Sequence, residues 1–219
     1  MISRGEEAVR ERLGKVYWIG GGSGAGKSTV ARRLAARFGL STYSTDDAMT
    51  DHARRSAPQE APLLHQFMAM DMDERWLNRT PATMLETFPW FKGEAFDLII
   101  EDVLRLPIET GVIVEGFRLL PALVKPILAK ACQAVWLLPA PSFRRAVMEA
   151  RAQSGNGFLS RTSDPPTALA NVLERDRLFT NILRQKTQQL DLPAIEVDAT
   201  MTEEDLTRRV ASMLELSDS

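Results

Sequence analysis

Along the chain, short apolar runs alternate with segments in which apolar residues recur at helical spacing. The runs end at glycine, proline or polar residues, as buried strands do where they enter loops. The helical segments carry apolar residues on one face, as with Val30, Leu34 and Phe38 ahead of the stop at Gly39. The pattern predicts strands at 16–20, 40–45, 111–116, 134–138 and 194–199.

Helical periodicity covers most of the remaining chain. A mostly helical stretch spans 47–106, and a polar loop with glycine and proline spans 154–166. Other helices are predicted at 4–13, 27–38, 121–131, 142–153, 167–190 and 202–214. Strands that alternate with helices predict an α/β fold, in which right-handed crossovers cover both faces of a parallel sheet.

Composition narrows the class of protein. The 219 residues are 44% hydrophobic and 26% charged, which suits one soluble domain with an insertion. A net charge of -2 argues against a broad nucleic-acid or anionic-membrane surface. Cys132 is the only cysteine, so neither an internal disulfide nor a cysteine metal cluster is expected. The charged first residues and the lack of a long apolar run predict a cytoplasmic protein without a membrane span.

A glycine-rich segment after the first predicted strand carries the clearest chemistry. Gly21, Gly26, Lys27 and Ser28 stand at the spacing G-x-x-x-x-G-K-[ST], between an apolar strand and an amphipathic helix. Such a loop wraps backbone N–H groups around a phosphate, the lysine reaches the β- and γ-phosphates, and the serine ligates Mg²⁺. The predicted nucleotide-binding residues are Gly21, Gly22, Ser23, Gly24, Ala25, Gly26, Lys27, Ser28 and Thr29.

The segment 21–29 resembles the phosphate-binding loop of P-loop NTPases. The order of elements is similar to their nucleoside and nucleotide kinase branch, which includes adenylate, shikimate and gluconate kinases. This resemblance implies a three-layer fold in a single domain over 1–219, with sheet order 2-3-1-4-5 and with ATP and Mg²⁺ as cofactors. It also implies a helical acceptor-binding lobe at 47–106 and a lid at 142–178.

Asp46 and Asp47 follow a predicted strand and Glu115 lies at the end of another, so these three acids should gather near the phosphate loop, because ligands bind at the carboxyl edge of a parallel sheet. The resemblance makes Asp46 the first choice to orient or deprotonate the acceptor hydroxyl, with Asp47 second. Ser28, Asp47 and Glu115 are the predicted metal-site residues. Two alternatives stay open: either aspartate could simply cap the next helix, and Glu115 could hydrogen-bond the loop structurally.

Arginines offer candidate grips for an acceptor anion. Arg118 stands in "EGFRLLP", which is similar to the "GFPR" segment of adenylate kinases but lacks the proline before the arginine. Arg54 and Arg55 lie where that family places another phosphate-binding arginine, although a solvated helix face explains the pair equally well.

The predicted lid region is also rich in arginine. Arg144 and Arg151 share a helix face, so they are favoured as the catalytic pair that closes over the phosphates. The full set of lid candidates is Arg144, Arg145, Arg151, Arg161, Arg175 and Arg177.

The predicted insertion contains Trp76 and the aromatic segment 88–91. These side chains could form a pocket wall, although packing is the more common role of such residues. The sequence thus predicts a small-molecule kinase whose acceptor is anionic. A 5′-hydroxyl polynucleotide kinase and a nucleotide-binding regulator without phosphotransfer are the alternatives, and the sequence indicates no oligomeric state.

Overall fold

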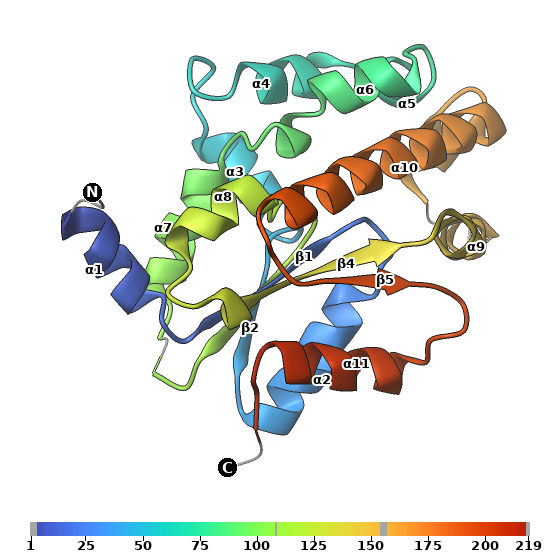
Figure 1. Ribbon diagram of the computed structural model, residues 1–219. Helices are drawn as coiled ribbons and strands as arrows, with labels where there is room; N and C mark the ends of the chain where they lie inside the picture. The colour runs from blue at the N-terminus through green and yellow to red at the C-terminus, as the bar shows by residue number, and fades with distance from the viewer. Residues whose placement is uncertain (1–3, 108, 154–156, 218–219) are drawn as a thin grey trace.

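A five-stranded parallel sheet forms the centre of the molecule (Figure 1). The computed structural model describes residues 4–107, 109–153 and 157–217. The strands are β1 (Val16–Gly21), β2 (Ser41–Ser44), β3 (Val112–Glu115), β4 (Ala134–Pro139) and β5 (Ala194–Val197). Their order is β2-β3-β1-β4-β5, and every pair is parallel, which confirms the predicted α/β fold and strand order.

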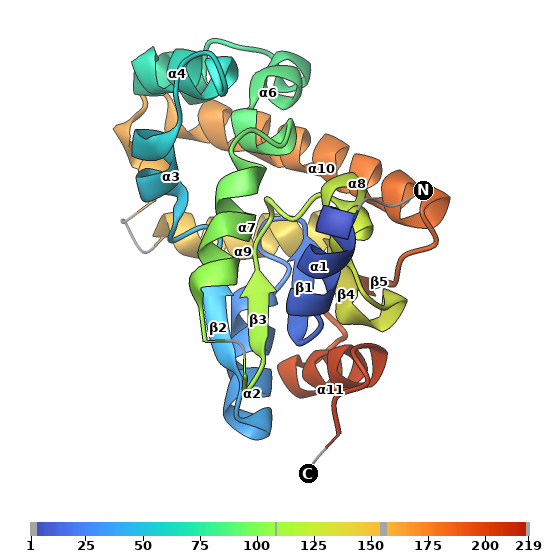
Figure 2. The same cartoon turned by 90° about the vertical axis from the view of Figure 1, so that its left-hand side faces the viewer.

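Helices cover both faces of the sheet. One face is covered by α2 (Lys27–Phe38) and α11 (Glu203–Met213) (Figure 1). The other face carries α1 (Arg4–Arg12), α7 (Phe96–Arg105), α8 (Pro121–Val124) and α10 (Pro165–Gln189). Outside this layer lie α3 (Met49–Arg55), α4 (Pro62–Ala69), α5 (Met72–Trp76), α6 (Pro81–Thr87) and the short helix η1 (Pro89–Phe91), which together form the insertion (Figure 2).

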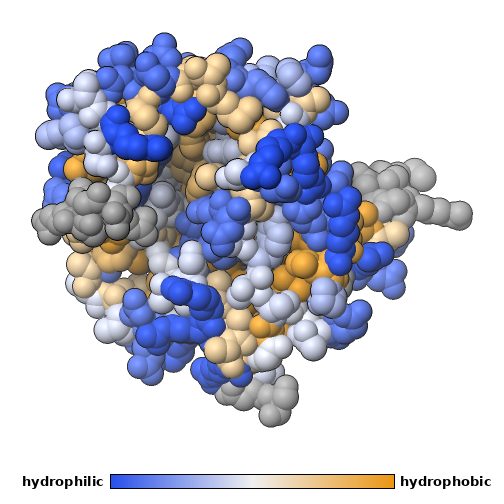
Figure 3. Space-filling model, turned by 180° about the vertical axis from the view of Figure 1, so that it is seen from behind, coloured by the Kyte–Doolittle hydropathy of each residue, from blue (hydrophilic) through white to orange (hydrophobic). Residues whose placement is uncertain are grey.

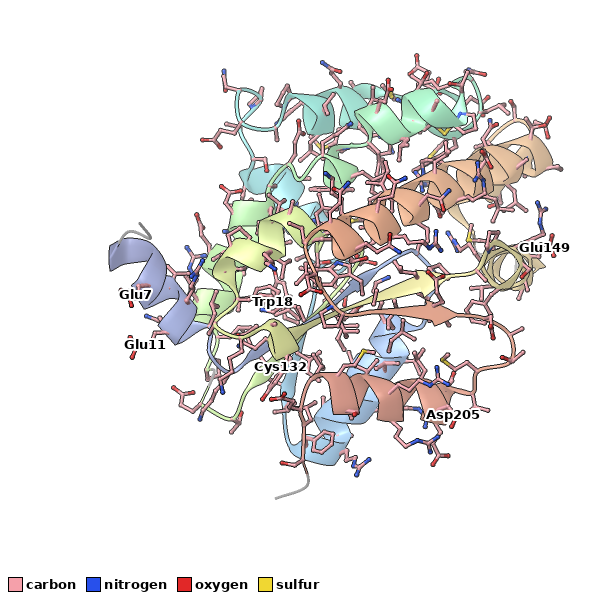
Figure 4. The ribbon with its side chains drawn as sticks, viewed as in Figure 1. Glu7, Glu11, Trp18, Cys132, Glu149 and Asp205 are labelled. Carbon is pink, nitrogen blue, oxygen red and sulfur yellow. The ribbon has the colours of Figure 1, made fainter. Side chains whose placement is uncertain are left out.

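Alternation along the strands builds two separate cores. In β1, Trp18 packs on the α7, α8 and α10 side of the sheet, whereas Ile19 packs on the α2 and α11 side (Figure 4). Residues that are adjacent in a strand point to opposite faces, so a strand buried on both sides needs apolar residues at nearly every position. The runs used to predict β1, β3 and β4 have that composition.

A third apolar cluster lies away from the sheet. It joins the insertion to α9 (Pro141–Gln153) and α10, with Trp76 and Phe88 on one side and Met148 and Val172 on the other. α10 is therefore shared between the sheet and the insertion. The packing of α10 on both parts therefore helps to set the position of the insertion relative to the sheet.

One predicted helix is broken. Instead of continuing through 121–131, the chain forms α8, then the 3₁₀ turns η2 (Lys125–Ile127) and η3 (Ala131–Gln133). Pro126 explains the break, because its ring clashes with the preceding turn and it has no N–H for a helical hydrogen bond.

The polar loop predicted at 154–166 also differs in part. It contains a 3₁₀ turn, η4 (Phe158–Arg161), and ends where α10 begins; residues 154–156 lie outside the described part of the chain. Across the described residues, no helix combines the length and apolar character required to cross a membrane.

Candidate active site

The phosphate loop connects β1 to α2 at the carboxyl edge of the sheet. Gly24 and Gly26 adopt left-handed backbone angles, with φ of 77° and 83°. A Cβ at Gly21 would stand only 2.0 Å from the Leu137 carbonyl oxygen, so a side chain there would displace β4. Gly26 begins α2, and no side chain of the described residues caps that helix end. The loop and the first N–H groups of α2 thus form a site suited to an anion.

Lys27 occupies the centre of this loop. Its ammonium is buried and donates to the Gly22 carbonyl oxygen at 2.8 Å. Burial lowers the pKa of Lys27, and the nearby Asp46 and Glu115 carboxyls oppose that shift. The lysine is therefore held inside the loop, close to Asp46 and Glu115, two of the three acids predicted to gather there.

Glu115 and Ser28 meet beside the lysine. Glu115 ends β3, and its Cα is paired in register with Ile19 of β1 and Ser44 of β2. Burial raises the pKa of Glu115, while Lys27 and hydrogen bonding from the Ser28 and Ser44 hydroxyls lower it. Its Oε2 atom is buried without a hydrogen-bond partner in the described structure.

These groups suit Mg²⁺. A hydroxyl and a carboxylate supply the oxygen ligands that this ion prefers, and the free Oε2 of Glu115 offers a contact to it or to its water. Within the described ranges, no group of three or more His, Cys, Asp or Glu side chains could hold a metal by itself. Phosphate oxygens and water would therefore have to complete the coordination, as is usual for Mg²⁺ at phosphate sites.

Asp46 and Asp47 follow β2 directly. The Asp46 carboxylate accepts a long hydrogen bond of 3.4 Å from the Thr45 hydroxyl. A Cβ on Gly116 would stand only 1.7 Å from the Thr45 hydroxyl oxygen and 3.1 Å from the Asp46 Oδ1 atom, so glycine at the end of β3 chiefly makes room for Thr45, beside Asp46. Burial raises the pKa of Asp46, and Lys27 opposes the rise. Asp46 therefore lies in the same electrostatic cluster as Lys27 and Glu115.

The capping alternative for the two aspartates is wrong. Helix α3 begins after Ala48, and no described side chain caps it. Asp47 is exposed, and its backbone N–H donates to the Ser44 hydroxyl oxygen at 3.3 Å. The carboxylates of Asp46 and Asp47 thus do not cap the helix that follows them.

Arg118 lies in the interior rather than at the surface of the site. Only 2% of the residue is exposed, and its guanidinium donates to the Thr45 and Ala95 carbonyl oxygens at 3.0 and 3.1 Å. It also lies over the Trp90 ring at 4.2 Å. Burial lowers the pKa of Arg118 to about 10. In this conformation the side chain ties β2 to the start of α7, and both terminal nitrogens are engaged with backbone.

Arg54 and Arg55 end α3 and are both exposed. Arg55 forms ion pairs with Asp51, Glu101 and Asp102 at 3.1, 3.0 and 2.7 Å. Its guanidinium is thus already matched by carboxylates. An acceptor anion would have to compete with these partners for Arg55, whereas Arg54 is open to solvent.

A buried cluster joins α9 to α10. Asp176 accepts from Arg144 at 2.5 and 3.2 Å and from Arg175 at 2.6 and 3.0 Å. The three residues are only 3–6% exposed. Burial raises the pKa of Asp176, but the guanidiniums of Arg175 and Arg144 outweigh it and hold the pKa below its usual range. One carboxylate thus orients two arginines.

This cluster touches the phosphate loop. The Nη1 atom of Arg144 is 2.9 Å from the position of a Cβ on Gly24, so the guanidinium packs directly on the loop. Arg144 was favoured from sequence, whereas Asp176 was missed and Arg175 was one lid candidate among several. The only local signal was an aspartate between two arginines in a helix, which is a common surface pattern.

The remaining lid arginines have other surroundings. Arg145 pairs with Glu149 at 3.8 Å and Arg177 pairs with Glu174 at 2.7 Å. Arg161 contacts the Met72 sulfur at 3.7 Å. Arg151 lies on α9, but its side chain is outside the described part of the structure, so its predicted role stays a prediction.

Comparison with curated proteins gives a weak match to a kinase. No family model matches the chain. The chain is 25% identical over 202 residues to a 2-phosphoglycerate kinase from Methanococcus maripaludis (strain C6 / ATCC BAA-1332), a match that covers 83% of the chain and 59% of the relative. The chain therefore corresponds to little more than half of that protein. The strand order is consistent with the α/β fold of P-loop kinases, and this weak similarity supports a kinase-like protein at most.

Proposed function

We propose that this protein transfers the γ-phosphoryl group of ATP, with Mg²⁺, to a hydroxyl or phosphate of a small anionic acceptor. The observation that carries the proposal is the convergence of Lys27, Asp46 and Glu115 at the uncapped start of α2. The similarity to a kinase supports the same reaction class. A net charge of -2 favours a small acceptor over a nucleic acid.

Each side chain of the cluster has a role in this proposal. Lys27 exchanges the Gly22 carbonyl for the β- and γ-phosphate oxygens, and Arg144 closes on the loop from the lid. Asp46 accepts the proton of the attacking hydroxyl. Ser28 and Glu115, with Asp47 as a further candidate ligand, hold Mg²⁺, which neutralises charge on the phosphate oxygens when bound.

The surrounding segments divide the work. In this proposal the insertion at 47–106 binds the acceptor and the segment 142–178 acts as the lid. Arg54, Arg55 and Arg118 remain proposed contacts to an acceptor anion; Arg55 would first have to leave its carboxylate partners, and Arg118 its backbone carbonyls.

Release of ADP tests the reaction class. The wild-type protein and Lys27→Ala are incubated with ATP and Mg²⁺ and with nucleosides, nucleoside monophosphates, sugar acids, phosphorylated hydroxy acids, aminoglycosides or 5′-hydroxyl oligonucleotides. Release that depends on both an acceptor and Lys27 supports a kinase and names the class of acceptor. ATP binding without stimulation by any acceptor would instead favour the nucleotide-binding regulator.

Asp46→Asn is expected to lower kcat by about 10²–10³-fold while changing the KM for ATP little, because a general base acts on the acceptor proton. Because the pKa of Asp46 lies above the ordinary aspartate value of about 3.9, the wild-type rate should already begin to fall at a pH above that value as the solution is acidified. The Asp46→Asn variant has no carboxyl to protonate at this position, so its rate should not show this fall. A pH–rate profile measures this. Asp47→Asn is the matched variant, and a larger kcat loss there would transfer the role to Asp47.

Glu115→Gln is expected to raise the Mg²⁺ concentration for half-maximal rate by about 10-fold or more, because an oxygen that orients the ion or its water is lost. Titration of the rate with Mg²⁺ at saturating ATP measures the effect. Glu149→Gln on the exposed surface of α9 is the control. An unchanged Mg²⁺ requirement in Glu115→Gln would remove this residue from the metal site.

A further inference from the structure

An aromatic cavity lies between the insertion and the lid helices. It has a volume of about 290 Å³, and seven of its lining side chains are aromatic. Trp76 is one of these lining residues, and its ring centroid lies 4.9 Å from that of Phe158, 5.4 Å from that of Phe67 and 6.1 Å from that of Phe88. The face seen from behind is hollowed below the insertion helices, with less polar residues inside the hollow and hydrophilic residues around it (Figure 3).

Polar groups line one part of this cavity. They are Ser23 of the phosphate loop and the guanidiniums of Arg144 and Arg175. An acceptor bound here would therefore contact the loop that holds the donor phosphates. The aromatic residues do more than pack the insertion onto α10, because they enclose a space that reaches the reactive edge of the sheet.

Both arginines keep an unused donor. The Nη1 atoms of Arg144 and Arg175 are buried and have no hydrogen-bond partner in the described structure, since Asp176 binds only the other edge of each guanidinium. Two guanidiniums also face a single carboxylate, which leaves one positive charge uncompensated within the cluster. An anion from the ligand would satisfy both the donors and the charge.

The walls favour a planar apolar group beside that anion. The Arg175 guanidinium lies within 4.7–5.2 Å of the ring centroids of Phe88, Trp76 and Phe91, so the charge is set directly against aromatic faces. A small hydrophilic acid would reach the arginines but would leave the aromatic walls facing water. The volume exceeds the ~150 Å³ that suffices for benzene in an apolar cavity.

We propose that this cavity binds the phosphoryl acceptor, and that the acceptor carries an anionic group on a planar ring. The ring lies among Trp76, Phe88 and Phe158, and the anion lies against Arg175 and Arg144 beside Ser23. The inference rests on the proposed kinase function and specifies its acceptor. It separates this chain from its relative, whose name specifies phosphoglycerate, an acid without a ring.

Binding of two matched phosphates tests the ring requirement. Phenyl phosphate and glycerol 2-phosphate carry the same anion with and without a ring. Each is titrated by calorimetry into the full chain saturated with Mg²⁺ and the non-hydrolysable β,γ-imido analogue of ATP, which keeps the probes out of the donor loop. Phenyl phosphate is expected to bind at least about 10-fold more tightly, and equal or reversed affinities would overturn the proposal.

Two variants assign the binding to this cavity. Phe158→Ala removes a partly exposed ring from the wall and should weaken phenyl phosphate by about five-fold without affecting glycerol 2-phosphate. Ile182→Ala is its control, because Ile182 is an exposed apolar residue of α10 that does not line the cavity. Arg175→Gln should weaken both phosphates by about 10-fold or more, whereas its exposed neighbour Arg177→Gln should not. A thermal melt of each variant checks folding, and unchanged affinities in folded Phe158→Ala and Arg175→Gln would exclude this site.

Turnover then separates this inference from the proposed function. Nucleoside monophosphates and aromatic hydroxy acids are compared with ringless hydroxy acids in the ADP assay. Lys27-dependent turnover of ring-bearing acceptors alone supports both the kinase function and the ring-bearing acceptor. It also shows whether nucleoside monophosphates or aromatic hydroxy acids are the acceptors. Turnover of ringless acceptors would keep the kinase and reject the ring-bearing acceptor. Selective binding of phenyl phosphate without turnover of any acceptor would keep the ring-and-anion site and reject phosphotransfer.

Discussion

Lys27→Ala is expected to lower acceptor-stimulated ADP formation by about 10³-fold or more, because the ammonium stabilises charge that develops between the β- and γ-phosphates. Loss of one preorganised donor at such a position typically costs about 10²–10³ in rate, and loss of a full charge at a transferring phosphoryl group costs more. The measurement is kcat at saturating ATP and acceptor, with ATP affinity measured separately.

The same substitution should leave the fold intact. In this conformation the buried ammonium donates a hydrogen bond to the Gly22 carbonyl oxygen, and burial lowers the pKa of Lys27. Removing it ends the cost of burying the ammonium, but it also takes the nearest positive charge away from Asp46 and Glu115, so the two effects oppose each other and the melting temperature should change little. Lys186→Ala, on the surface of α10, is the control. Turnover retained by folded Lys27→Ala protein would contradict the active-site assignment.

The hydrophobic pattern predicted the positions of the strands but not which strands lie side by side in the sheet. Buried strands such as β3 and β4 can be recognised by their continuous apolar runs. The placement of β3 between β1 and β2 came instead from the resemblance to P-loop kinases. Apolar runs fix which residues are buried and leave open which strand lies beside which, because every central strand buries similar residues.

Local motifs and long-range contacts differ in the same way within the site. The phosphate loop is one continuous segment whose spacing carries its own geometry, so it could be identified directly. Arg144 and Asp176 are 32 positions apart and meet only because α9 packs beside α10. The sequence placed Arg118 correctly after β3, but its burial against the Thr45 and Ala95 carbonyls depends on α7 and the insertion. The direction in which a side chain points is set by its tertiary neighbours, so it could not be predicted from the local sequence.

Asp176→Asn is expected to cause the largest loss of stability, about 3–5 kcal/mol in the free energy of unfolding. The carboxylate is the shared partner of Arg144 and Arg175, and all three residues are buried. Removing one charge from a buried ion-pair cluster leaves the remaining charges without compensation, which costs far more than losing an exposed pair. Asparagine preserves the shape and some hydrogen bonding, so the variant isolates the charge. Urea unfolding monitored by tryptophan fluorescence measures the difference.

Glu174→Gln is the matched control, because Glu174 lies two residues away on α10 and pairs with Arg177 at the surface. Its loss should stay below about 1 kcal/mol. The activity of Asp176→Asn should also fall, since Arg144 would lose the contact that holds it against Gly24. Equal stability losses in the two variants would mean that the buried cluster contributes no more than a surface pair.

The pH dependence of that loss tests its electrostatic origin. The pKa of Asp176 is lower in the folded protein than in the unfolded chain, where it is about 3.9. At any pH above that unfolded value, the ionised carboxylate therefore makes its full contribution to the free energy of unfolding. That contribution disappears as the pH falls through the lower, folded pKa. The gap between wild type and Asp176→Asn should therefore be constant near neutral pH and should shrink in acid. A gap that persists unchanged at low pH would assign the loss to hydrogen-bond geometry, and the two arginines would then need no counter-charge from the chain.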